Sequence, residues 1–271
     1  MRLRFLFWNT HKSDLTSRIA SIARSQSIDV IVLAEYDSSI SALLQTLQSR
    51  TGDSYNSIPS YTSKTVLIAR LPLRCIEERY NDVSGWLTVR EILPDSAQSL
   101  LVASVHLPDK SRYASEDQAH AARTVAQSIQ TSEEDAGHTR TVLVGDFNMN
   151  PFEPGLVMAD GFNAVMTRDL ARVNSRTVRR RTYPVFYNPM WAFFGDGTPG
   201  PAGTYYYKEQ TPSNHFWHIY DQVMVRPSIL HSLQRVEILS HDGDQTLLTR
   251  TGRPSRSAAS DHLPILFDLH L

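Results

Sequence analysis

The chain has 271 residues, of which 41% are hydrophobic and 20% charged, and its net charge is near −1. This composition is typical of a soluble globular protein, and the length suits one large core, so we expect a single domain over residues 1–271. A net charge near zero predicts no overall attraction to nucleic acid. The sequence contains one cysteine, Cys75, which excludes an internal disulfide and a cysteine zinc cluster. With no signal peptide or transmembrane segment in the sequence, we expect a cytoplasmic protein.

The first fifty residues alternate between predicted strands and predicted helices. Residues 3–8 and 29–33 are apolar runs typical of buried strands. After each run, apolar side chains recur at helical spacing, first from Leu15 to Ala23 and then from Ile40 to Leu47. This order predicts two parallel strands with helices packed on the sheet.

The middle of the chain changes to predicted strands. Residues 64–70, 85–93 and 99–106 each favour a strand, and the short connections between them predict an antiparallel meander. A capping box of Ser115 with Gln118 then begins a predicted helix whose small apolar side chains face the core. Its inward-facing residues are Ala119, Ala122, Ala126 and Ile129.

Residues 168–214 follow no clear period. Six arginines and one acid, Asp169, lie between residues 168 and 181, and aromatic residues, Pro and Gly follow them. We predict a long functional loop here, and a solvated basic face is the alternative interpretation of the arginines. Predicted strands resume at residues 219–225, 235–239 and 263–269.

Several predicted strands end on polar residues. The strand at 141–144 is followed by Gly145, Asp146 and Asn148. Paired carboxylate and carboxamide groups suit a metal ion, a phosphate or an activated water, but the same residues are typical of a turn. If the strand geometry continues, Asp146 and Asn148 project to one side while Phe147 packs on the other. The other polar strand ends are Asn9, Glu35, His106, Asp221 and Asp261 with His262.

In chain order, these strand ends resemble the endonuclease/exonuclease/phosphatase superfamily, whose fold is that of pancreatic deoxyribonuclease. The matching phrases are WNTHK, LAEYD, SVHLPD, VGDFNMNP, YDQVMV and SDHLPI, which are spread over essentially the whole chain. The resemblance implies a four-layer α/β sandwich, in which two mixed, mostly antiparallel β-sheets pack face to face with helices on the outer faces. It also implies a phosphoesterase that depends on a divalent metal, most often Mg²⁺, with Mn²⁺ as an alternative.

The resemblance implies a metal site built from oxygen donors. Glu35 resembles the principal ligand, and Asn9 and Asp261 lie near the ion in that comparison. Carboxylate and carbonyl oxygens without cysteine are the donors that Mg²⁺ prefers. Taken alone, Glu35 is also typical of an acid at the start of a helix, and Asp261 of a turn.

The resemblance also implies roles in catalysis. Asp146 would position or deprotonate the attacking water, and Asn148 would donate to the phosphate as charge builds on it. His262 would contact the phosphate or act as a base, oriented by Asp221, and His106 would assist the leaving group. Two departures are present. The residues flanking Asp221 differ from the usual family pattern, and we find no acidic partner for His106 in the predicted strand region that holds Lys64 and Thr65.

Three functions are compatible with these residues. The first is a nuclease acting on DNA or RNA, whose backbone phosphates Lys12, Arg179, Arg180 and Arg181 would bind. The second is a phosphoesterase for phospholipid or inositol-phosphate headgroups, for which an exposed apolar loop at 190–194 is a candidate. The third is a binding module without catalysis, which the intact polar strand ends disfavour.

Overall fold

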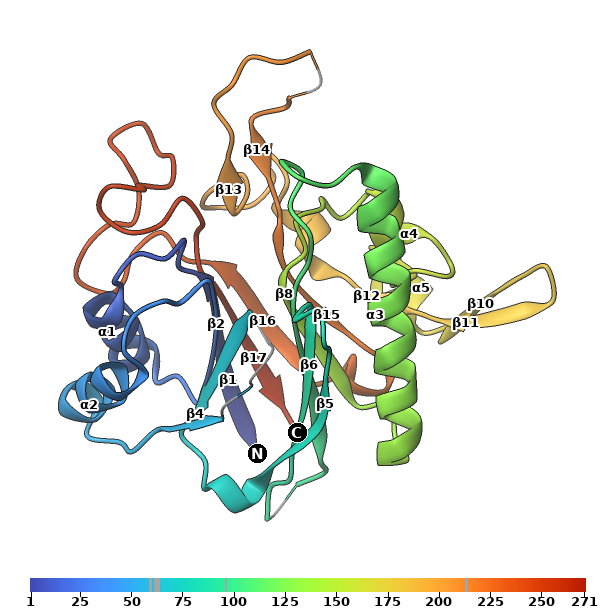
Figure 1. Cartoon of the computed structure of the whole chain (residues 1–271), viewed down its shortest axis with the longest axis horizontal. Helices are drawn as coiled ribbons and strands as arrows, with labels where there is room; N and C mark the ends of the chain where they lie inside the picture. The colour runs from blue at the N-terminus through green and yellow to red at the C-terminus, as the bar shows by residue number, and fades with distance from the viewer. Residues whose placement is uncertain (59, 61–63, 96, 213) are drawn as a thin grey trace.

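The computed structural model describes residues 1–58, 60, 64–95, 97–212 and 214–271. Most strands form two mixed sheets that pack face to face (Figure 1). The six-stranded sheet has the order β16 (Leu233–Ile238), β17 (Ile265–His270), β1 (Arg2–Asn9), β2 (Val30–Ala34), β4 (Thr65–Ala69), β3 (Asn56–Ile58). The seven-stranded sheet has the order β5 (Ile76–Asn81), β6 (Leu87–Ile92), β7 (Leu100–His106), β8 (Thr141–Asp146), β15 (Asp221–Val225), β12 (Phe186–Tyr187), β9 (Ala164–Val165).

Helices cover the two outer faces of this pair of sheets. Helices α1 (Thr16–Gln26) and α2 (Ile40–Thr51) lie outside the six-stranded sheet, and α3 (Ser115–Ala136) lies outside the seven-stranded one (Figure 1). Two short helices, α4 (Pro154–Val157) and α5 (Arg168–Ala171), follow β8. The predicted four-layer α/β sandwich is therefore confirmed, as is the parallel pairing of β1 with β2. Among the described residues, every helix is too short or too polar to cross a membrane.

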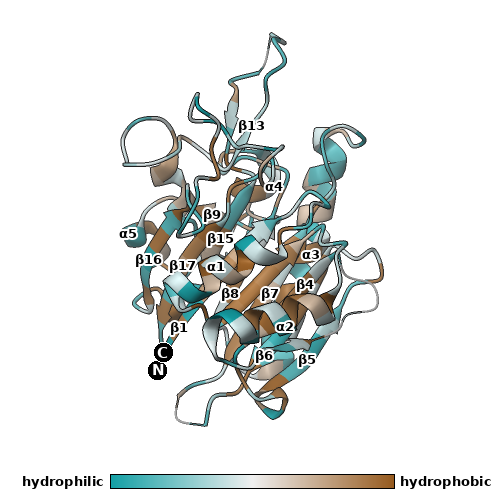
Figure 2. Ribbon diagram, turned by 90° about the vertical axis from the view of Figure 1, so that its left-hand side faces the viewer, coloured by the Kyte–Doolittle hydropathy of each residue, from teal (hydrophilic) through white to brown (hydrophobic). Residues whose placement is uncertain are grey.

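Strand β8 shows how the sequence builds these layers. Successive side chains of a strand point to opposite faces. Val142 and Val144 belong to the core between the sheets, whereas Leu143 belongs to the core beneath α3. Because both faces of β8 are covered, the strand is a continuous apolar run rather than an alternating one (Figure 2).

The middle strands do not form one meander, so that prediction is wrong. β4 pairs with β2 and β3 in the six-stranded sheet, whereas β5, β6 and β7 pair in the other sheet. The chain changes sheets between Ala69 and Ile76, through a 3-10 turn at Leu73–Cys75. Alternation of apolar residues indicates that a segment is a strand, but it does not say which sheet the strand joins.

The start of α3 also differs from the prediction. The residue before the helix is Ala114, whose backbone N–H donates to the carboxylate of Asp117, so the predicted pair of Ser115 and Gln118 does not cap it. The Gln118 side chain instead donates to the carbonyl oxygens of Pro108 and Asn148. The predicted inward face is confirmed, since Ala119, Ala122, Ala126 and Ile129 are buried.

The predicted loop at 168–214 contains regular structure, apart from Ser213, which lies outside the described residues. It holds α5, the hairpin of β10 (Ser175–Val178) with β11 (Arg181–Pro184), β12, and β13 (Tyr205–Tyr206), which pairs with β14 (Trp217–His218). Strands of two to four residues are too short to show a period in the sequence. Nor is 190–194 an exposed apolar loop, because Met190 is buried and Phe193 and Phe194 pack against the core.

Candidate active site

The register of the seven-stranded sheet brings three polar strand ends together. His106 ends β7 opposite Asp146, which ends the parallel neighbour β8. Asp221 begins β15 on the other side of β8, also opposite Asp146. Since β15 is antiparallel, its first residue lies at the same edge as the last residues of β7 and β8. The sheet therefore places these three side chains next to one another.

The six-stranded sheet contributes the opposite side of the site. Asn9 ends β1 and pairs with Ala34, which precedes Glu35. The Asn9 amide nitrogen donates to Asp146 Oδ2 at 2.9 Å and lies 3.5 Å from Glu35 Oε1. Asn9 is fully buried, so this hydrogen bond joins the two sheets in a region without solvent.

Gly145 lets β8 approach β7 closely at the site. A Cβ at this position would lie 2.0 Å from the carbonyl oxygen of Val105, well inside any allowed contact. Only glycine therefore permits this spacing. The residue that separates the apolar strand from Asp146 is thus required by the sheet itself.

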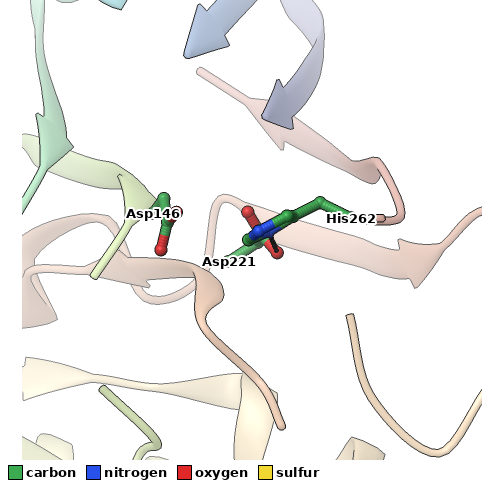
Figure 3. Close-up of side chains that lie close together, drawn as sticks. All are labelled: Asp146, Asp221 and His262. Carbon is green, nitrogen blue, oxygen red and sulfur yellow. Dashed lines mark hydrogen bonds and ion pairs between the residues drawn. The ribbon is translucent and has the colours of Figure 1, made fainter. Parts of the chain in front are cut away.

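Asp221 and His262 form a buried pair (Figure 3). His262 Nδ1 lies 2.8 Å from Asp221 Oδ2, as expected if Asp221 orients the imidazole. Burial alone would lower the pKa of His262, but the charge and hydrogen bond of Asp221 outweigh burial and raise it. The imidazolium form is therefore favoured, and the tautomer of the neutral form is fixed by Asp221.

His262 is held by further hydrogen bonds. The Trp8 indole N–H donates to the His262 carbonyl oxygen at 2.9 Å. Ser260 Oγ accepts from the His262 backbone N–H at 3.1 Å and donates to the Asn9 carbonyl oxygen at 2.8 Å. These contacts tie the loop before β17 to the end of β1, so the position of the ring is set by the six-stranded sheet.

Two carboxylates lie near His106. Its Nε2 is 3.5 Å from Glu35 Oε1 and 3.9 Å from Asp146 Oδ2. Burial lowers the pKa of His106, although the charges of Asp146 and Glu35 act in the opposite direction. The acid near His106 that we did not find in the sequence is therefore Glu35, a predicted metal ligand that follows a strand of the opposite sheet.

Glu35 is not an acid at a helix start. Helix α2 begins at Ile40 and is capped by Ser39, whose hydroxyl accepts from the Ala42 backbone N–H. Glu35 instead follows β2 in the left-handed region, with φ 51°. That conformation is unfavourable for a residue with a side chain and is held here by the Thr10 hydroxyl and Lys12 N–H, which both donate to the Glu35 carbonyl oxygen.

Asp146 stabilises a turn and also belongs to the candidate site. Its Oδ1 accepts from the Asn148 backbone N–H at 2.8 Å, which is the turn interaction that the sequence left open. Asn148 adopts φ 51°, so the strand geometry does not continue, and its amide nitrogen donates to the Leu107 carbonyl oxygen. The expectation that Asp146 and Asn148 project together along one strand face is wrong, but Phe147 is buried against Phe162 as predicted.

Two groups of side chains could hold a metal ion. Asp146, Asp221 and His262 each offer a ligand atom, and these atoms lie within 4.8 Å of one another. In that group His262 Nδ1 is already engaged by Asp221. Glu35 offers carboxylate oxygens, and its side chain is 26% exposed, whereas Asn9 turns its amide nitrogen toward Glu35 and accepts from the His11 backbone N–H through Oδ1. Three buried polar atoms at the site have no hydrogen-bond partner among the described residues: Asp221 Oδ1, Asp261 Oδ1 and His106 Nδ1.

The remaining predicted site residues are Asp261 and Lys12, which flank the site, and the three arginines of the hairpin, which lie farther out. Asp261 Oδ1 lies 3.5 Å from His11 Nδ1, and Lys12 is an exposed neighbour of Glu35 in the Thr10–Lys12 turn. Arg179 and Arg180 form the exposed tip of the β10–β11 hairpin and Arg181 begins β11, on the flank beside α5 (Figure 1). Within the described part of the chain, none of these three arginines hydrogen-bonds or ion-pairs with a strand-end residue.

Sequence reasoning missed Thr204 and Tyr205. Thr204 Oγ1 accepts from the Asp221 backbone N–H at 3.2 Å. The Tyr205 ring lies 4.8 Å from the His262 ring, measured between centroids. Both follow Gly203, where a Cβ would lie 2.6 Å from the His218 carbonyl oxygen, so this glycine marks the close approach that carries them to the site. The sequence contains no distinct signal for either residue, because Gly203 is one of four glycines between residues 195 and 203.

Comparisons with known proteins agree with this fold. The chain aligns over 99% of its length with all of an endonuclease/exonuclease/phosphatase family protein from Leptotrichia buccalis C-1013-b (14% identity, TM-score 0.62). It aligns over 99% of both chains with the endonuclease domain of TRAS1, a telomere-specific non-LTR retrotransposon (12% identity, TM-score 0.57). It also aligns over 100% of its length with 99% of the chain of D. rerio TDP2 complexed with single strand DNA product (14% identity, TM-score 0.55).

Two sequence comparisons complete this result. A search of curated proteins gave no match. The model of the endonuclease/exonuclease/phosphatase family matches residues 6–262, a span that includes every strand-end residue from Asn9 to His262. On these grounds, the chain belongs to the endonuclease/exonuclease/phosphatase family.

Proposed function

We propose that the protein is a Mg²⁺-dependent phosphodiester hydrolase that cleaves nucleic acid. The observation that carries the proposal is the junction of the two sheets, where Asn9 fixes Asp146 and Asp221 fixes His262. A carboxylate and an oriented imidazole, each fixed by a buried hydrogen bond, are the groups that water activation and phosphate binding require. A binding module without catalysis would not need both to be held in this way.

Each residue has a step that its geometry allows. Asp146 accepts hydrogen bonds from Asn9 and from Asn148, so its carboxylate is fixed while lone pairs remain for the attacking water. Asp221 holds Nδ1 of His262, which leaves Nε2 of that ring for a phosphate oxygen. His106, with its pKa lowered by burial, is the neutral base or donor on the opposite side of Asp146.

The oxygen donors around Glu35 fit a hard divalent cation. Glu35 would be the principal ligand, and Asn9 would contribute only through the second lone pair of Oδ1, which already accepts from the His11 backbone N–H. Asp261 would be a further ligand, since its Oδ1 is buried without a hydrogen-bond partner among the described residues. A bound Mg²⁺ would neutralise charge on the phosphate oxygens during in-line attack. His262 is not needed as a ligand, because its pairing with Asp221 already gives it another role.

The case for a nucleic-acid substrate rests on the surroundings of the site. Tyr205 contacts the catalytic imidazole, and exposed basic side chains, including Lys12, lie near the strand ends. Aromatic rings with cations are the usual partners of bases and backbone phosphates. TRAS1 is an endonuclease, and TDP2 was solved with a single-stranded DNA product, which supports the same substrate class. A lipid headgroup is less well supported, because Met190 is buried and Phe193 packs against the core.

A substrate panel tests this proposal. Single-stranded and double-stranded DNA, RNA, and phospholipid and inositol-phosphate headgroups are incubated with the enzyme and Mg²⁺, with Mn²⁺ as a second ion. We expect nucleic-acid cleavage that stops on chelation, returns when Mg²⁺ is added back, and is absent in Asp146→Asn. Cleavage undiminished after exhaustive chelation would refute the metal requirement, and hydrolysis of headgroups alone would refute the substrate class.

A further inference from the structure

A groove opens beside the strand-end site. It encloses about 450 Å³, within the range of cavities that bind small ligands. Residues 205–209 form one wall and residues 249–256 the other. The groove reaches the site through Tyr205 and Asp261, the two lining residues that lie next to His262.

The wall at 249–256 belongs to a loop that is anchored to the fold. Asp242 at its base accepts from the Arg18 guanidinium of α1 at 2.7 Å and, through Oδ1, from the backbone N–H groups of Asp244 and Gln245. Leu247 is fully buried in the core, and Leu248 bridges to Pro254. The wall is therefore preformed, and binding a ligand against it would require little ordering.

The opposite wall is also fixed. Tyr205 and Tyr206 pair with His218 and Trp217 across the β13–β14 ladder. The Tyr206 ring meets Trp217 edge to face, at 5.3 Å between centroids. This wall therefore presents two tyrosines from a short, paired strand and a third, Tyr207, directly after it, which is 41% exposed.

Positive charge gathers in this groove. The Arg253 guanidinium lies over the Tyr206 ring, 4.2 Å from its centroid, an arrangement that holds the cation without neutralising it. Within the described ranges, Lys208, Arg253 and Arg256 form no ion pair with an acid. The lining carries these three cations against two acids, Glu209 and Asp261, so it is positive on a chain whose net charge is −1. Cations left without partners along a groove favour a ligand with phosphates.

We infer that this groove binds the single strand of nucleic acid that flanks the scissile phosphate, with Arg253 and Arg256 on a backbone phosphate and Tyr207 stacked on an unpaired base. The inference rests on the proposed function and deepens it. Among the described residues, the lining offers tyrosine rings for bases but no Leu, Ile, Val or Met side chain for an acyl tail. A cavity of this size admits about one or two nucleotides, so a base-paired duplex would have to be opened before its strand entered.

Binding of a labelled five-nucleotide single strand, as DNA and as RNA, tests this inference by fluorescence anisotropy in EDTA, where nothing is cleaved. We expect Arg253→Ala with Arg256→Ala to raise Kd by roughly tenfold or more and to lower the slope of log K against log salt by about 0.7, the value for one phosphate contact of a single strand. Tyr207→Ala should raise Kd roughly fivefold or more. Arg250→Ala, on the same loop but outside the lining, is the matched control and should change neither quantity.

Hydrolysis of bis(p-nitrophenyl) phosphate with Mg²⁺ separates this inference from the proposed function, because this small diester has no flanking strand. The double arginine variant should cleave it as the parent does, while KM rises for the oligonucleotide. If the parent cleaves the diester but the affinity for the strand is unchanged by the Arg253 and Arg256 substitutions, the inference about the groove is overturned and the proposed function is not. If the two substitutions weaken strand binding but the parent cleaves no diester, the inference about the groove is supported and the proposed function is overturned. Equal affinity for a duplex, or stronger binding of inositol hexakisphosphate, would overturn the single-strand assignment.

Discussion

The strand-end site and the β10–β11 hairpin both carry ionisable side chains, but in opposite settings. At the site, Asp146, Asp221 and His262 are buried and hydrogen-bonded, and the register of two sheets fixes them. In the hairpin, Arg179 and Arg180 are exposed, and both adopt left-handed backbone conformations, with φ 49° and 67°. A two-residue turn with positive φ at both positions suits Asn and Gly, not arginine.

This difference suggests that the strand-end residues perform the reaction and that the loop residues select the substrate. Groups that must be placed within a fraction of an ångström lie on strand ends, where neighbouring strands hold them. Groups that meet a flexible polyanion lie on turns and loops, where small errors in position matter less. We therefore expect substitutions at the strand ends to change kcat, and substitutions in the hairpin and the groove to change KM and the dependence on salt.

The largest effect should come from the His262 and Asp221 pair. We expect His262→Ala and Asp221→Asn each to lower kcat by on the order of 10³-fold, with little change in KM. The double variant should be little worse than the more damaging single one, because Asp221 acts through His262. Steady-state kinetics of all three variants provide the measurement. Additive losses would show that the two residues act independently, and the acids Asp242 or Asp244 would then be tested as partners of His262.

A smaller effect should come from Glu35. We expect Glu35→Gln to raise the Mg²⁺ concentration for half-maximal rate by roughly tenfold or more, because a neutral amide binds a hard cation less tightly than a carboxylate. The unfolding midpoint should stay close to that of the parent, since the Glu35 side chain is partly exposed. Metal titrations with the parent and the variant provide the measurement. Superimposable titrations would mean that Glu35 is not a ligand.

The hairpin should contribute less. Replacing Arg179, Arg180 and Arg181 with Ala should weaken binding of a nucleic-acid strand several-fold and reduce its dependence on salt, because each lost phosphate contact removes a released counterion. The Mg²⁺ requirement should not change. Anisotropy at several salt concentrations measures both quantities. If the variant and the parent have the same slope, the arginines form only a solvated face.

The smallest effect concerns stability, and it tests how the β13–β14 wall of the groove is joined to the loop that holds Asn150. His218 Nδ1 lies 3.1 Å from the Asn150 amide nitrogen, which donates to a neutral ring. Burial, with further contributions from His215 and Lys110, lowers the pKa of His218 to about 3. An unfolded histidine has a pKa near 6.5, so only the unfolded state gains this proton between about pH 6.5 and pH 3. Stability should therefore fall as the pH drops through that window.

A substitution isolates this contribution. In His218→Gln the acid-induced loss of unfolding free energy should be smaller than in the parent, as measured by denaturant titrations at pH 7.5 and pH 4.5. His241→Gln, at an exposed position, is the control. Equal losses in all three proteins would show that His218 does not link the β13–β14 wall to the Asn150 loop.

Much of this arrangement could be predicted from the sequence because local patterns determine it. Apolar runs indicated the strands, helical spacing indicated α1, α2 and α3, and the residues after each strand indicated the site. Asp221 was the least typical of the family, yet it lies 2.8 Å from His262, because its position is fixed by the register with Asp146 rather than by its flanking residues.

Other features depend on contacts between segments far apart in sequence. The acid nearest His106 is Glu35, which comes from the other sheet, and no pattern around either residue indicates that they meet. The pairing of β4 with β2 in the six-stranded sheet also depends on contacts between distant segments, which local patterns do not predict. The groove required two loops, at 205–209 and 249–256, whose residues have no period and meet only in three dimensions.

The most direct test of the central claim, that the joined strand ends hydrolyse phosphodiesters, is the rate of bis(p-nitrophenyl) phosphate hydrolysis by the parent and by Asp146→Asn with Mg²⁺. The parent should turn over this substrate and lose the activity on chelation. Asp146→Asn should be slower by on the order of 10³-fold or more. The amide keeps the size of the carboxylate but can accept only one of its two hydrogen bonds, so the unfolding midpoint should fall, and the rates are compared at a temperature where both proteins are folded. Equal rates for the two proteins would contradict the claim, because they would show that the site where the sheets meet does not perform the reaction.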